Sequence, residues 1–491
     1  MNDTHSNDPK QFISVFGEKN NENQLKLPNG KIITFNDEQI LGIKKINSWL
    51  KRTNENIFVL SGYAGTGKTT IIKKIIDSYR KGIAVSAPTH KAKKVIMRTT
   101  KKEGQTLPAL LGLRPDLSLD NFNPNDPQFD TIAIPKITDY NLVIIDEASM
   151  INYQLYNLIL KQIKGSNTKI LFMGDPAQIP PVGEKESIVF NLETENKHHL
   201  TKVERQNDTN PLFYVYDDLR NNLMDIDGGI KRISRINDLN EGVLFTIDKR
   251  LFRNLVIDKF ASSDFKENID FVRMIAWKND TVILSNKIIR NELFSPDSKF
   301  IEIGDLLMGY RTVSTKNFQH NIIENSADYK IVDMSPLEKN EYGIFGHRIK
   351  LEEITWDNNK KHEKVFIVDP NNIESINTYS SYHDTLRDEA KKNKKLWPKY
   401  YEFRRRNLLM NKIITYANGQ YRNNYDIITK DLDYAYSITA HKSQGSTYDH
   451  VCVMENDINQ NWLIKERNQI KYVALTRPTT TATVLTTKID G

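Results

Sequence analysis

The sequence predicts an α/β protein with two lobes, each built on a parallel sheet. Residues 62–69 read Gly-Tyr-Ala-Gly-Thr-Gly-Lys-Thr between an apolar run, Ile57–Leu60, and a segment whose apolar residues recur at helical spacing. Three more apolar runs end in polar residues: Ile83–Ser86, Leu142–Ile145 and Ile170–Met173. Alternation of such runs with helical stretches is typical of a parallel sheet covered by helices.

The N-terminal segments precede this first sheet. Residues 1–24 are rich in Asn, Asp and Lys without periodicity, so we expect a flexible tail. Asn29-Gly30 between short apolar runs predicts a small hairpin over 25–33. A helix over 35–50 should follow, with Asn36 as its cap. The first lobe is therefore predicted to span residues 25–205.

A second parallel sheet is predicted in the last part of the chain, in a lobe formed by 206–300 and 430–491. Its expected strands are Thr281–Ser285, Tyr434–Ile438, Val451–Met454, Tyr472–Leu475 and Ala482–Leu485. They are short apolar or β-branched runs, which suit strands buried on both faces.

Two segments interrupt these lobes. Residues 107–136 contain several prolines and are predicted to be an inserted, pin-like hairpin or loop. Residues 301–429 contain short β-like runs, Arg348–Leu351 and Lys364–Val368, followed by a charged, aromatic helical segment over about 381–416. We expect a small β-barrel there, with a helical tower.

The bulk composition limits the classes of function. One cysteine, Cys452, excludes a disulfide framework and a cysteine-based zinc site. The net charge of +7 is compatible with a polyanionic partner without requiring one. An apolar run long enough for a membrane span is missing, and the polar N-terminus has no signal-peptide core, so the expected location is cytoplasmic.

The glycine-rich segment matches a phosphate loop, GxxxxGK[ST]. Its backbone N–H groups and the following helix N-terminus bind polyphosphate. Lys68 should reach the β- and γ-phosphates, and Thr69 should ligate Mg²⁺. The predicted nucleotide-binding residues are Gly62, Ala64, Gly65, Thr66, Gly67, Lys68, Thr69 and Thr70.

Two further polar groups follow strands of the same sheet. Asp146 and Glu147 come directly after a buried run, where Asp146 should hold Mg²⁺ and Glu147 should orient the attacking water. Gln178 lies in Gly-Asp-Pro-Ala-Gln after the next strand, and is predicted to sense the γ-phosphate. A solvated helix start and an ordinary turn are the structural alternatives.

The order of these motifs resembles that of superfamily 1 helicases. The phosphate loop, Ser86–Lys94, Asp146–Ser149 and Gly174–Gln178 are followed by three more matching segments: Val203–Gln206, Thr439–Gly445 and Val473–Arg477. The pattern is most similar to that of the RecD-like, 5′-to-3′ members, and among these to the Dda-like helicases of T-even-type phages. The resemblance extends from about Phe35 to the end of the chain and implies two RecA-like motor lobes.

The resemblance also assigns residues that spacing alone does not. It implies that Gln39 reads adenine, that Arg205 and Arg477 are arginine fingers, and that Gly445 brings backbone close to the nucleotide. Gln39 could instead be an exposed helix residue, and either arginine could form a surface ion pair. Pro478 directly after Arg477 departs from the usual pattern and restricts the arginine backbone.

The same resemblance predicts the residues that face DNA. They are Pro88, Thr89, His90, Lys93 and Thr106 in the first lobe, Thr439, His441 and Ser443 in the second, and Phe129, or alternatively Phe122, in the pin-like segment. Hydroxyl and imidazole groups can bind phosphates without reading sequence, as a motor requires. His90 could instead be structural, and Phe129 could belong to a core.

Residues 391–406 interleave basic and aromatic side chains. Such a segment can bind single strands, but it also fits a solvated helix with one packed aromatic stripe. Because the resemblance places this segment in the tower, we favour the interpretation as a helix with a packed aromatic stripe over direct contact with DNA. His198-His199 has no ligand cluster around it in the sequence and is not expected to bind metal.

The sequence thus predicts an ATP- and Mg²⁺-dependent DNA helicase. It should act as a monomer on single-stranded DNA and on single-strand/duplex junctions, with a single-strand-binding protein or other replication proteins as candidate partners. Three alternatives remain open: a translocase or nuclease-complex motor that does not separate strands, an RNA helicase of the same superfamily, and a non-motor nucleotide-binding protein or kinase.

Overall fold

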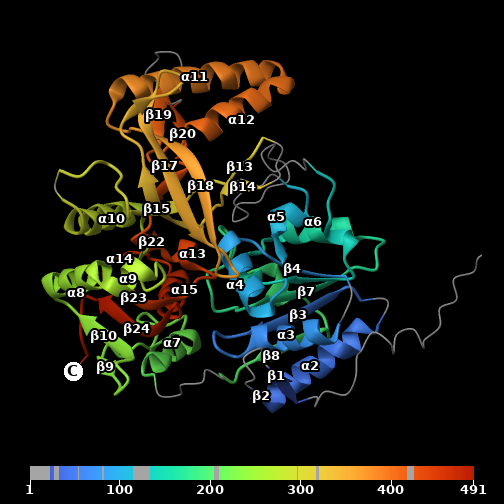
Figure 1. Ribbon diagram of the computed structural model, residues 1–491. Coiled ribbons are helices and arrows are strands. Elements are labelled where there is room, and N and C mark those ends of the chain that lie inside the picture. Colours follow the sequence, from blue (N-terminus) through green and yellow to red (C-terminus); the bar gives the residue numbers. More distant parts are fainter. Residues whose placement is uncertain are drawn as a thin grey trace, which may run out of the picture. The chain divides into compact units, whose positions relative to one another are not determined.

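A computed structural model describes residues 23–26, 32–52, 55–79, 82–113, 133–203, 210–295, 297–316, 320–416 and 425–490. The chain divides near residue 208 into two compact units, each of which is described by itself (Figure 1). Residues 1–22 of the predicted tail, the tip of the hairpin and most of the pin-like segment lie outside the described residues, whereas Gln24, the last residue of the predicted tail, begins strand β1.

The first unit contains a six-stranded sheet in which every neighbouring pair is parallel. Its order is β5-β4-β6-β7-β3-β8. The bounds are β3 Ile57–Gly62, β4 Ile83–Ala87, β5 Gly104–Thr106, β6 Leu142–Ile145, β7 Lys169–Gly174 and β8 Lys197–Leu200. The four strands predicted from apolar runs are confirmed. β6 and β7 are buried along their whole length, as expected for strands covered on both faces.

Helices and one hairpin complete this unit. β1 and β2 pair antiparallel, which confirms the predicted hairpin strands. α2 begins after Asn36, whose side chain accepts from the backbone N–H of Gln39 at 2.8 Å, so the predicted cap is confirmed. The bounds are β1 Gln24–Lys26, β2 Ile32–Thr34, α2 Asp37–Leu50, α3 Lys68–Ser78, α4 His90–Thr100, α5 Leu107–Leu110 and α6 Tyr153–Ile163.

The second unit contains a six-stranded sheet of order β22-β11-β23-β24-β10-β9. All neighbouring pairs are parallel except β9 with β10. The bounds are β9 Arg235–Ile236, β10 Gly242–Thr246, β11 Val272–Ala276, β22 Ser437–Thr439, β23 Tyr448–Met454 and β24 Pro478–Leu485. Helices of this unit include α7 Leu212–Asn221, α8 Lys249–Ala261, α9 Ser263–Glu267, α10 Asn279–Leu293, α13 Ala440–Ser443, α14 Glu455–Ile458 and α15 Ile464–Leu475.

Two of the predicted strands of this sheet are wrong. Thr281–Ser285 belongs to α10, and β11 takes its place in the sheet. Asp457, from a distant part of the chain, fixes the turn that precedes α10: its carboxylate accepts from the N–H groups of Trp277 and Lys278 at 2.8 and 2.9 Å. Tyr472–Leu475 is the last turn of α15, where all four side chains are buried. A helix buried all round has no polar face, so its apolar run resembles a strand.

The predicted strand Tyr434–Ile438 is two strands. β21, Leu432–Tyr434, pairs with β12 in the insertion, and β22 pairs with β11 in the motor sheet. The chain therefore passes from one sheet to the other at Ala435-Tyr436, both of which are buried.

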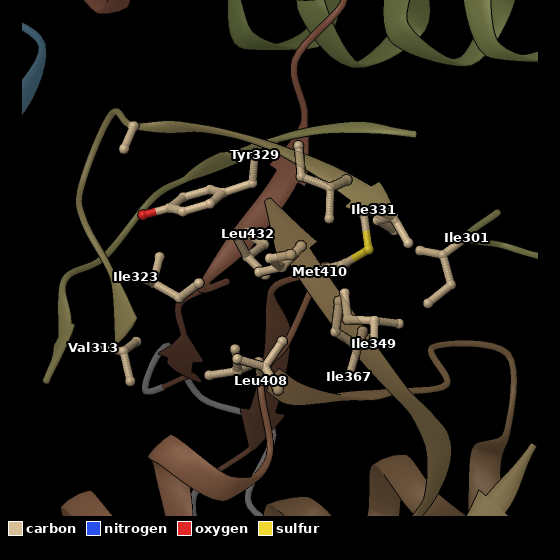
Figure 2. Packing of buried hydrophobic residues seen from close by; sticks show 14 residues of the cluster. Ile301, Val313, Ile323, Tyr329, Ile331, Ile349, Ile367, Leu408, Met410 and Leu432 are labelled. Atoms are coloured by element: carbon tan, nitrogen blue, oxygen red, sulfur yellow. The ribbon is translucent and has the colours of Figure 1, made fainter. Parts of the chain in front are cut away.

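The insertion forms an antiparallel sheet of order β16-β17-β15-β12-β21, with β18 as a further partner of β17. Its bounds are β12 Leu306–Gly309, β15 Asp328–Met334, β16 Glu338–Lys339, β17 Phe345–Ile354 and β18 Lys360–Val368, beside a small pair, β13 Val313–Ser314 and β14 Asn321–Ile323. Tyr329, Ile331, Ile349, Ile367 and Leu432 gather in its core (Figure 2). Closure into a barrel and the exact insertion boundaries stay predictions.

The helical tower differs from its predicted bounds of 381–416. α11 begins earlier, at Ile373, and ends at Lys392; α12 spans Trp397–Arg406, and the rest of the range includes strand β19, Ile413–Tyr416, which pairs with β20, Tyr425–Ile428. Phe403 is 1% exposed and packs on Tyr379 and Tyr342. One aromatic stripe is thus packed, as favoured from the sequence.

Within the described residues, the helices lack an apolar stretch of the length that a bilayer crossing requires.

Candidate nucleotide site and nucleic-acid track

The topology of the first sheet brings the phosphate loop and the two carboxylate-containing loops to one edge. β7 lies between β3 and β6, and Ser61 pairs with Gly174 while Ile145 pairs with Phe172. Because these strands are parallel, the segments that follow them, 62–67, 146–149 and 175–178, leave the same edge of the sheet. Ligands of open α/β sheets bind at this carboxyl edge.

The phosphate loop has the backbone that its glycines permit. Gly65 and Gly67 have φ of 82° and 80°, in the left-handed region that side chains disfavour. Gly67 precedes the first residue of α3, so the N-terminal N–H groups of this helix face the loop. Lys68 Nζ donates to the carbonyl oxygens of Gly62 and Tyr63 at 2.6 and 2.9 Å. The ammonium group is therefore placed over the loop that it is predicted to serve.

Gln39 contacts the phosphate loop directly. Its side chain is 4% exposed, and Nε2 donates to the Thr66 carbonyl at 3.0 Å. Its Oε1 accepts from the backbone N–H of Asn36 at 3.1 Å, which completes a capping box. A Cβ added to Gly67 would collide with the Gln39 amide. The alternative of an exposed glutamine is wrong, while the predicted contact with adenine stays a prediction.

Asp146 and Glu147 occupy a strained turn at the end of β6. Glu147 has φ of 54°, an uncommon value for a residue with a side chain, and its N–H donates to Asp146 Oδ1 at 2.8 Å. Burial raises the pKa of Asp146 to about 7, and the neighbouring Glu147 charge acts in the same direction. Gly174 makes room for this turn, because a Cβ there would lie 2.9 Å from the Ala148 nitrogen.

Gln178 lies in a tight loop after β7. Asp175 is fully buried, and its Oδ1 accepts from the N–H of Ala177 at 2.9 Å. The Gln178 N–H donates to the Asp175 carbonyl at 3.2 Å, and its side chain is 7% exposed. The loop therefore holds Gln178 in one place, as its predicted sensing role requires.

His199 is a residue near this site that the sequence analysis did not assign. Its Nδ1 lies 2.9 Å from Ser61 Oγ, and its ring makes an edge contact with Tyr63, with 5.1 Å between ring centroids. Partial burial lowers the pKa of His199, while the charge of Asp175 opposes that shift. The side chains of β8 alternate between exposed and buried, which is the signal that could have placed His199 and His198 on opposite faces. His198 Nε2 contacts the Glu38 carbonyl at 2.7 Å.

The donor set at this edge fits a nucleotide with a divalent cation. The left-handed glycines open a concave run of N–H groups for phosphate, and Lys68 supplies a positive charge. Asp146 and Glu147 bring two adjacent carboxylates to this edge, and carboxylate oxygens are ligands that a hard cation prefers. Thr69, the second residue of α3, brings a hydroxyl oxygen, the kind of ligand that Mg²⁺ prefers.

The predicted DNA-facing residues of the first unit cluster where β4 and β5 end. Thr89 caps α4 by accepting from the N–H of Ala92 at 3.2 Å. His90 is 8% exposed, and its Nδ1 lies 3.3 Å from Lys93 Nζ. Pro88 is buried, and Thr106 is 8% exposed at the end of β5. Thr89 and Lys93 are the more accessible members of this cluster.

The second unit repeats this arrangement where β22 ends. Thr439 caps α13 by accepting from the N–H of Lys442 at 3.2 Å. His441 is half-buried, whereas Ser443 is fully buried and donates its hydroxyl to the Ala440 carbonyl at 2.7 Å. Ser443 therefore supports the turn in this structure. Gly445 has φ of 71°, which explains the glycine at this position.

Arg477 lies at the end of α15, inside its own unit. It is 6% exposed and donates to the carbonyl oxygens of Val473 and Ser446 at 3.0 and 3.1 Å and to the Thr476 hydroxyl at 2.9 Å. A role as arginine finger stays a prediction and requires these hydrogen bonds to rearrange. Arg205, Phe122 and Phe129 lie outside the described residues.

Two family descriptions match parts of this chain. An AAA domain matches residues 36–227, which include the phosphate loop and the segments that follow β6 and β7. A UvrD-like helicase C-terminal domain matches residues 434–485, which include Thr439, Gly445 and Arg477.

Similar proteins include viral and bacterial ones. A protein of Acanthamoeba polyphaga mimivirus is 28% identical over 87% of this chain and 94% of its own length. The ATP-dependent DNA helicase dda of Enterobacteria phage T4 is 30% identical over 51% of this chain and 55% of its own length. The ATP-dependent RecD2 DNA helicase of Deinococcus radiodurans is 29% identical over 36% of this chain and 25% of its own length. The chain thus spans about half of the dda helicase and a quarter of RecD2.

Solved structures share the fold over nearly the whole chain. Pif1 helicase from Bacteroides, in a complex with ADP-AlF3 and single-stranded DNA, has a TM-score of 0.51 at 18% identity and covers 90% of this chain and 91% of its own. A structure of Pif1 helicases on forked duplex DNA has a TM-score of 0.52 at 16% identity, with 94% and 95% coverage.

Proposed function

We propose that this chain, which belongs to the superfamily 1 helicases of the RecD, Pif1 and Dda type, is an ATP-dependent DNA helicase that acts on single-stranded DNA. One observation supports this most strongly. The phosphate loop, the Asp146-Glu147 turn and the Gln178 loop leave one edge of a parallel sheet, with the strand before Gln178 between the other two. A binding protein would not need the strained acidic turn.

Each of the residues at this edge of the sheet has a separate proposed role in ATP hydrolysis. Lys68 and the N–H groups of the loop would hold the phosphates, while Thr69 and Asp146 would hold Mg²⁺, which neutralises phosphate charge when bound. Glu147 would orient the attacking water and polarise it. Gln178 would respond to the γ-phosphate. In the full cycle, Arg205 and Arg477 would stabilise the charge of the transferring phosphoryl group.

Grip on DNA is proposed for the two capped turns, one in each unit. Thr89 with His90 and Lys93, and Thr439 with His441, bring hydroxyl, imidazole and ammonium groups to helix N-termini at strand ends. Such groups bind phosphates of any sequence. Alternating grip at these turns during the hydrolysis cycle would move the strand.

The remaining features of the proposal come from the family resemblance. They are 5′-to-3′ movement, action as a monomer, work at single-strand/duplex junctions, and cooperation with a single-strand-binding protein or other replication proteins in the cytoplasm. Phe129 in the pin-like segment would stack on a base or part the strands.

The test of the catalytic assignment is the ATPase rate with and without single-stranded DNA. Wild-type protein should hydrolyse ATP faster in the presence of the strand. Lys68→Ala and Glu147→Gln should each lower the rate by roughly 100-fold or more, because each removes a group that acts on the transferring phosphate or the attacking water. Unchanged circular dichroism would show that the fold survives. Retained hydrolysis in either variant, or a wild-type rate that ignores the strand, would contradict the assignment.

A further inference from the structure

We infer that His199, near the end of strand β8, is a positioning residue for nucleotide binding: it holds the entrance of the phosphate loop in place while Lys68 moves from that loop to the phosphates. This role rests on the proposed ATP hydrolysis, because it concerns how the same site binds its nucleotide. His199 Nδ1 lies 2.9 Å from Ser61 Oγ, and the His199 ring contacts the edge of the Tyr63 ring, with 5.1 Å between centroids. The two contacts fall on either side of Gly62, the first residue of the loop.

The register of the sheet places the His199 side chain beside this loop. His199 pairs with Ser61 of β3, and Ser61 pairs with Gly174 of β7, so the three residues form one row across parallel strands. Side chains of such a row project from the same face of the sheet. His198, the preceding residue, projects from the other face and contacts the Glu38 carbonyl at 2.7 Å. His198 therefore joins β8 to α2, whereas His199 meets the phosphate loop.

Lys68 holds the same stretch of backbone in this structure. Its Nζ donates to the carbonyl oxygens of Gly62 and Tyr63 at 2.6 and 2.9 Å. An ammonium group has three hydrogens to donate, so Lys68 must release at least one carbonyl to reach both the β- and the γ-phosphate. The loop entrance then loses a hydrogen bond. The contacts of His199 with Ser61 and Tyr63 do not involve Lys68, and they keep this backbone in place during the exchange.

The charge state of His199 suits positioning better than direct binding of phosphate. Partial burial lowers its pKa from the ordinary value of 6.5; the charge of Asp175 opposes that shift, and the charge of Lys68 supports it. The ring is therefore neutral at neutral pH and adds no positive charge that would attract phosphate. A neutral ring can still share a hydrogen bond with Ser61 through Nδ1 in either tautomer, since a hydroxyl group both donates and accepts.

The experiment measures nucleotide binding and hydrolysis by the full chain. Titration with the fluorescent analogue mant-ADP and Mg²⁺ gives a dissociation constant, and the ATPase assay with saturating single-stranded DNA gives KM and kcat. Lys197→Ala is the matched control, because Lys197 is exposed and lies two residues before His199, on the same face of β8. His199 is also at an exposed position, so its replacement leaves the core of the unit intact.

We expect His199→Ala to raise both the dissociation constant of mant-ADP and the KM for ATP by roughly 5- to 10-fold, through loss of one hydrogen bond and one ring contact. Turnover at saturating ATP should stay within about 2-fold of wild type, because His199 acts on binding and not on the reacting atoms. A merely structural role would instead reduce the active fraction, which lowers kcat and leaves KM unchanged. Adding Ser61→Ala to His199→Ala should weaken binding little further, because their shared contact is already lost.

Two conservative variants separate the hydrogen bond from the size of the side chain. Asparagine places an amide atom where Nδ1 lies and can keep the bond with Ser61, whereas glutamine places its amide near the position of Nε2. His199→Asn should therefore bind mant-ADP within about 3-fold of wild type, and His199→Gln should bind it as weakly as His199→Ala. This comparison decides the matter even if the alanine variant is too unstable to purify.

Four results would overturn the positioning role of His199. They are an unchanged dissociation constant and KM in His199→Ala, a loss confined to kcat, an equal loss of binding in Lys197→Ala, and an asparagine variant that binds no better than the glutamine variant. A wild-type protein that binds no mant-ADP and hydrolyses no ATP would contradict the proposed function itself. The wild-type measurements thus separate failure of the proposed function from failure of this assignment.

Discussion

Glu147 joins an unfavourable backbone conformation to a proposed chemical role. Its φ of 54° is in the left-handed region, which costs a residue with a Cβ roughly 1–2 kcal/mol. The next residue, Ala148, is packed under Gly174, so the turn cannot relax by moving toward β7. The backbone conformation sets the direction of the Glu147 side chain, which is proposed to orient the attacking water. Strain of this kind is frequent at functional sites.

This strain predicts an unusual order of stability. Glu147→Gly should be more stable to denaturant than Glu147→Ala by about 1 kcal/mol, because glycine adopts this φ without cost. In a right-handed position the order is reversed, and the exposed helix residue Glu389 provides that control, with Ala more stable than Gly. Both Glu147 variants should lack ATPase activity. Equal stability, or a more stable alanine variant, would contradict the role of strain.

Sequence reasoning located the chemical groups of the nucleotide site well, since a phosphate loop and an Asp-Glu pair after buried runs are local patterns. It did not find His199, because the hydrogen bond with Ser61 joins positions 138 residues apart. It also left Gln39 open, since contact with Thr66 depends on how α2 packs against the loop. Local motifs reveal which groups are present, whereas packing decides which groups meet.

At the scale of elements, α13 is tied to the insertion by one lysine. Lys442 Nζ donates to Asn325 Oδ1 at 2.8 Å and to Ser326 Oγ at 3.2 Å, and it lies over the Tyr310 ring at 5.1 Å. Since Thr439 caps the same helix, these contacts hold one proposed DNA-gripping turn against the β12 to β15 region.

A double-mutant cycle should measure this tie. Lys442→Met and Asn325→Ala should each lower the free energy of unfolding by about 1 kcal/mol, and the double variant should lose less than their sum by about 0.5–1.5 kcal/mol. Denaturant unfolding measures all four proteins. Strict additivity would mean that the contact does not stabilise the element.

A buried charge cluster holds α14 and α15 together. Glu455 is 2% exposed and pairs with Arg232 at 2.7 Å and with Lys471 at 3.1 Å. Burial tends to raise the pKa of Glu455, but the hydrogen bond with Arg232 and the charge of Lys471 outweigh it, so the pKa is lowered. A carboxyl group with a lowered pKa contributes stability above its unfolded pKa, near 4.5, and this contribution is lost as the pH falls through the lower folded value.

The pH dependence of unfolding should therefore depend on Glu455. Wild-type protein should lose stability as the pH falls below about 4.5, and Glu455→Gln should flatten this acid limb. At neutral pH the variant should be less stable by about 3 kcal/mol, because two buried cations lose their partner. Denaturant titrations from neutral to acid pH measure both effects. An acid limb identical to that of wild type would show that other carboxyl groups control it.

The two incorrectly predicted strands show that contacts between distant residues can decide whether a segment is a helix or a strand. Thr281–Ser285 is β-branched and apolar, yet it is helical, and Asp457, which is far away in the chain, satisfies the N–H groups that precede α10. In contrast, the strand β11 contains Arg273, an unlikely core residue by composition. Its guanidinium is fully buried because it pairs with Asp328 of the insertion at 3.2 Å. Both cases depend on tertiary partners.

Both units of the molecule contain the same local arrangement, a threonine-capped helix after a parallel strand. In each unit a threonine at or just after the end of a parallel strand caps the next helix: Thr89 follows β4 and caps α4, and Thr439 ends β22 and caps α13. Two parallel sheets could be predicted because each leaves several buried runs in the sequence. The β-rich character of the insertion could be predicted from the sequence. Its bounds and its sheet order could not, because they depend on long-range pairing such as β12 with β21.

We propose that ATP hydrolysis at the first sheet drives the separation of DNA strands. The most direct test measures unwinding of duplexes that carry either a 5′ or a 3′ single-stranded tail, made of DNA and RNA in parallel, with ATP and Mg²⁺. We expect ATP-dependent unwinding of the 5′-tailed DNA by the wild-type protein, and none by Lys68→Ala. Unwinding from 3′ tails alone would contradict the proposed 5′-to-3′ direction, and unwinding of RNA alone would contradict DNA as the substrate. A wild-type protein that hydrolyses ATP on single strands without unwinding either duplex would contradict the proposal that hydrolysis drives strand separation.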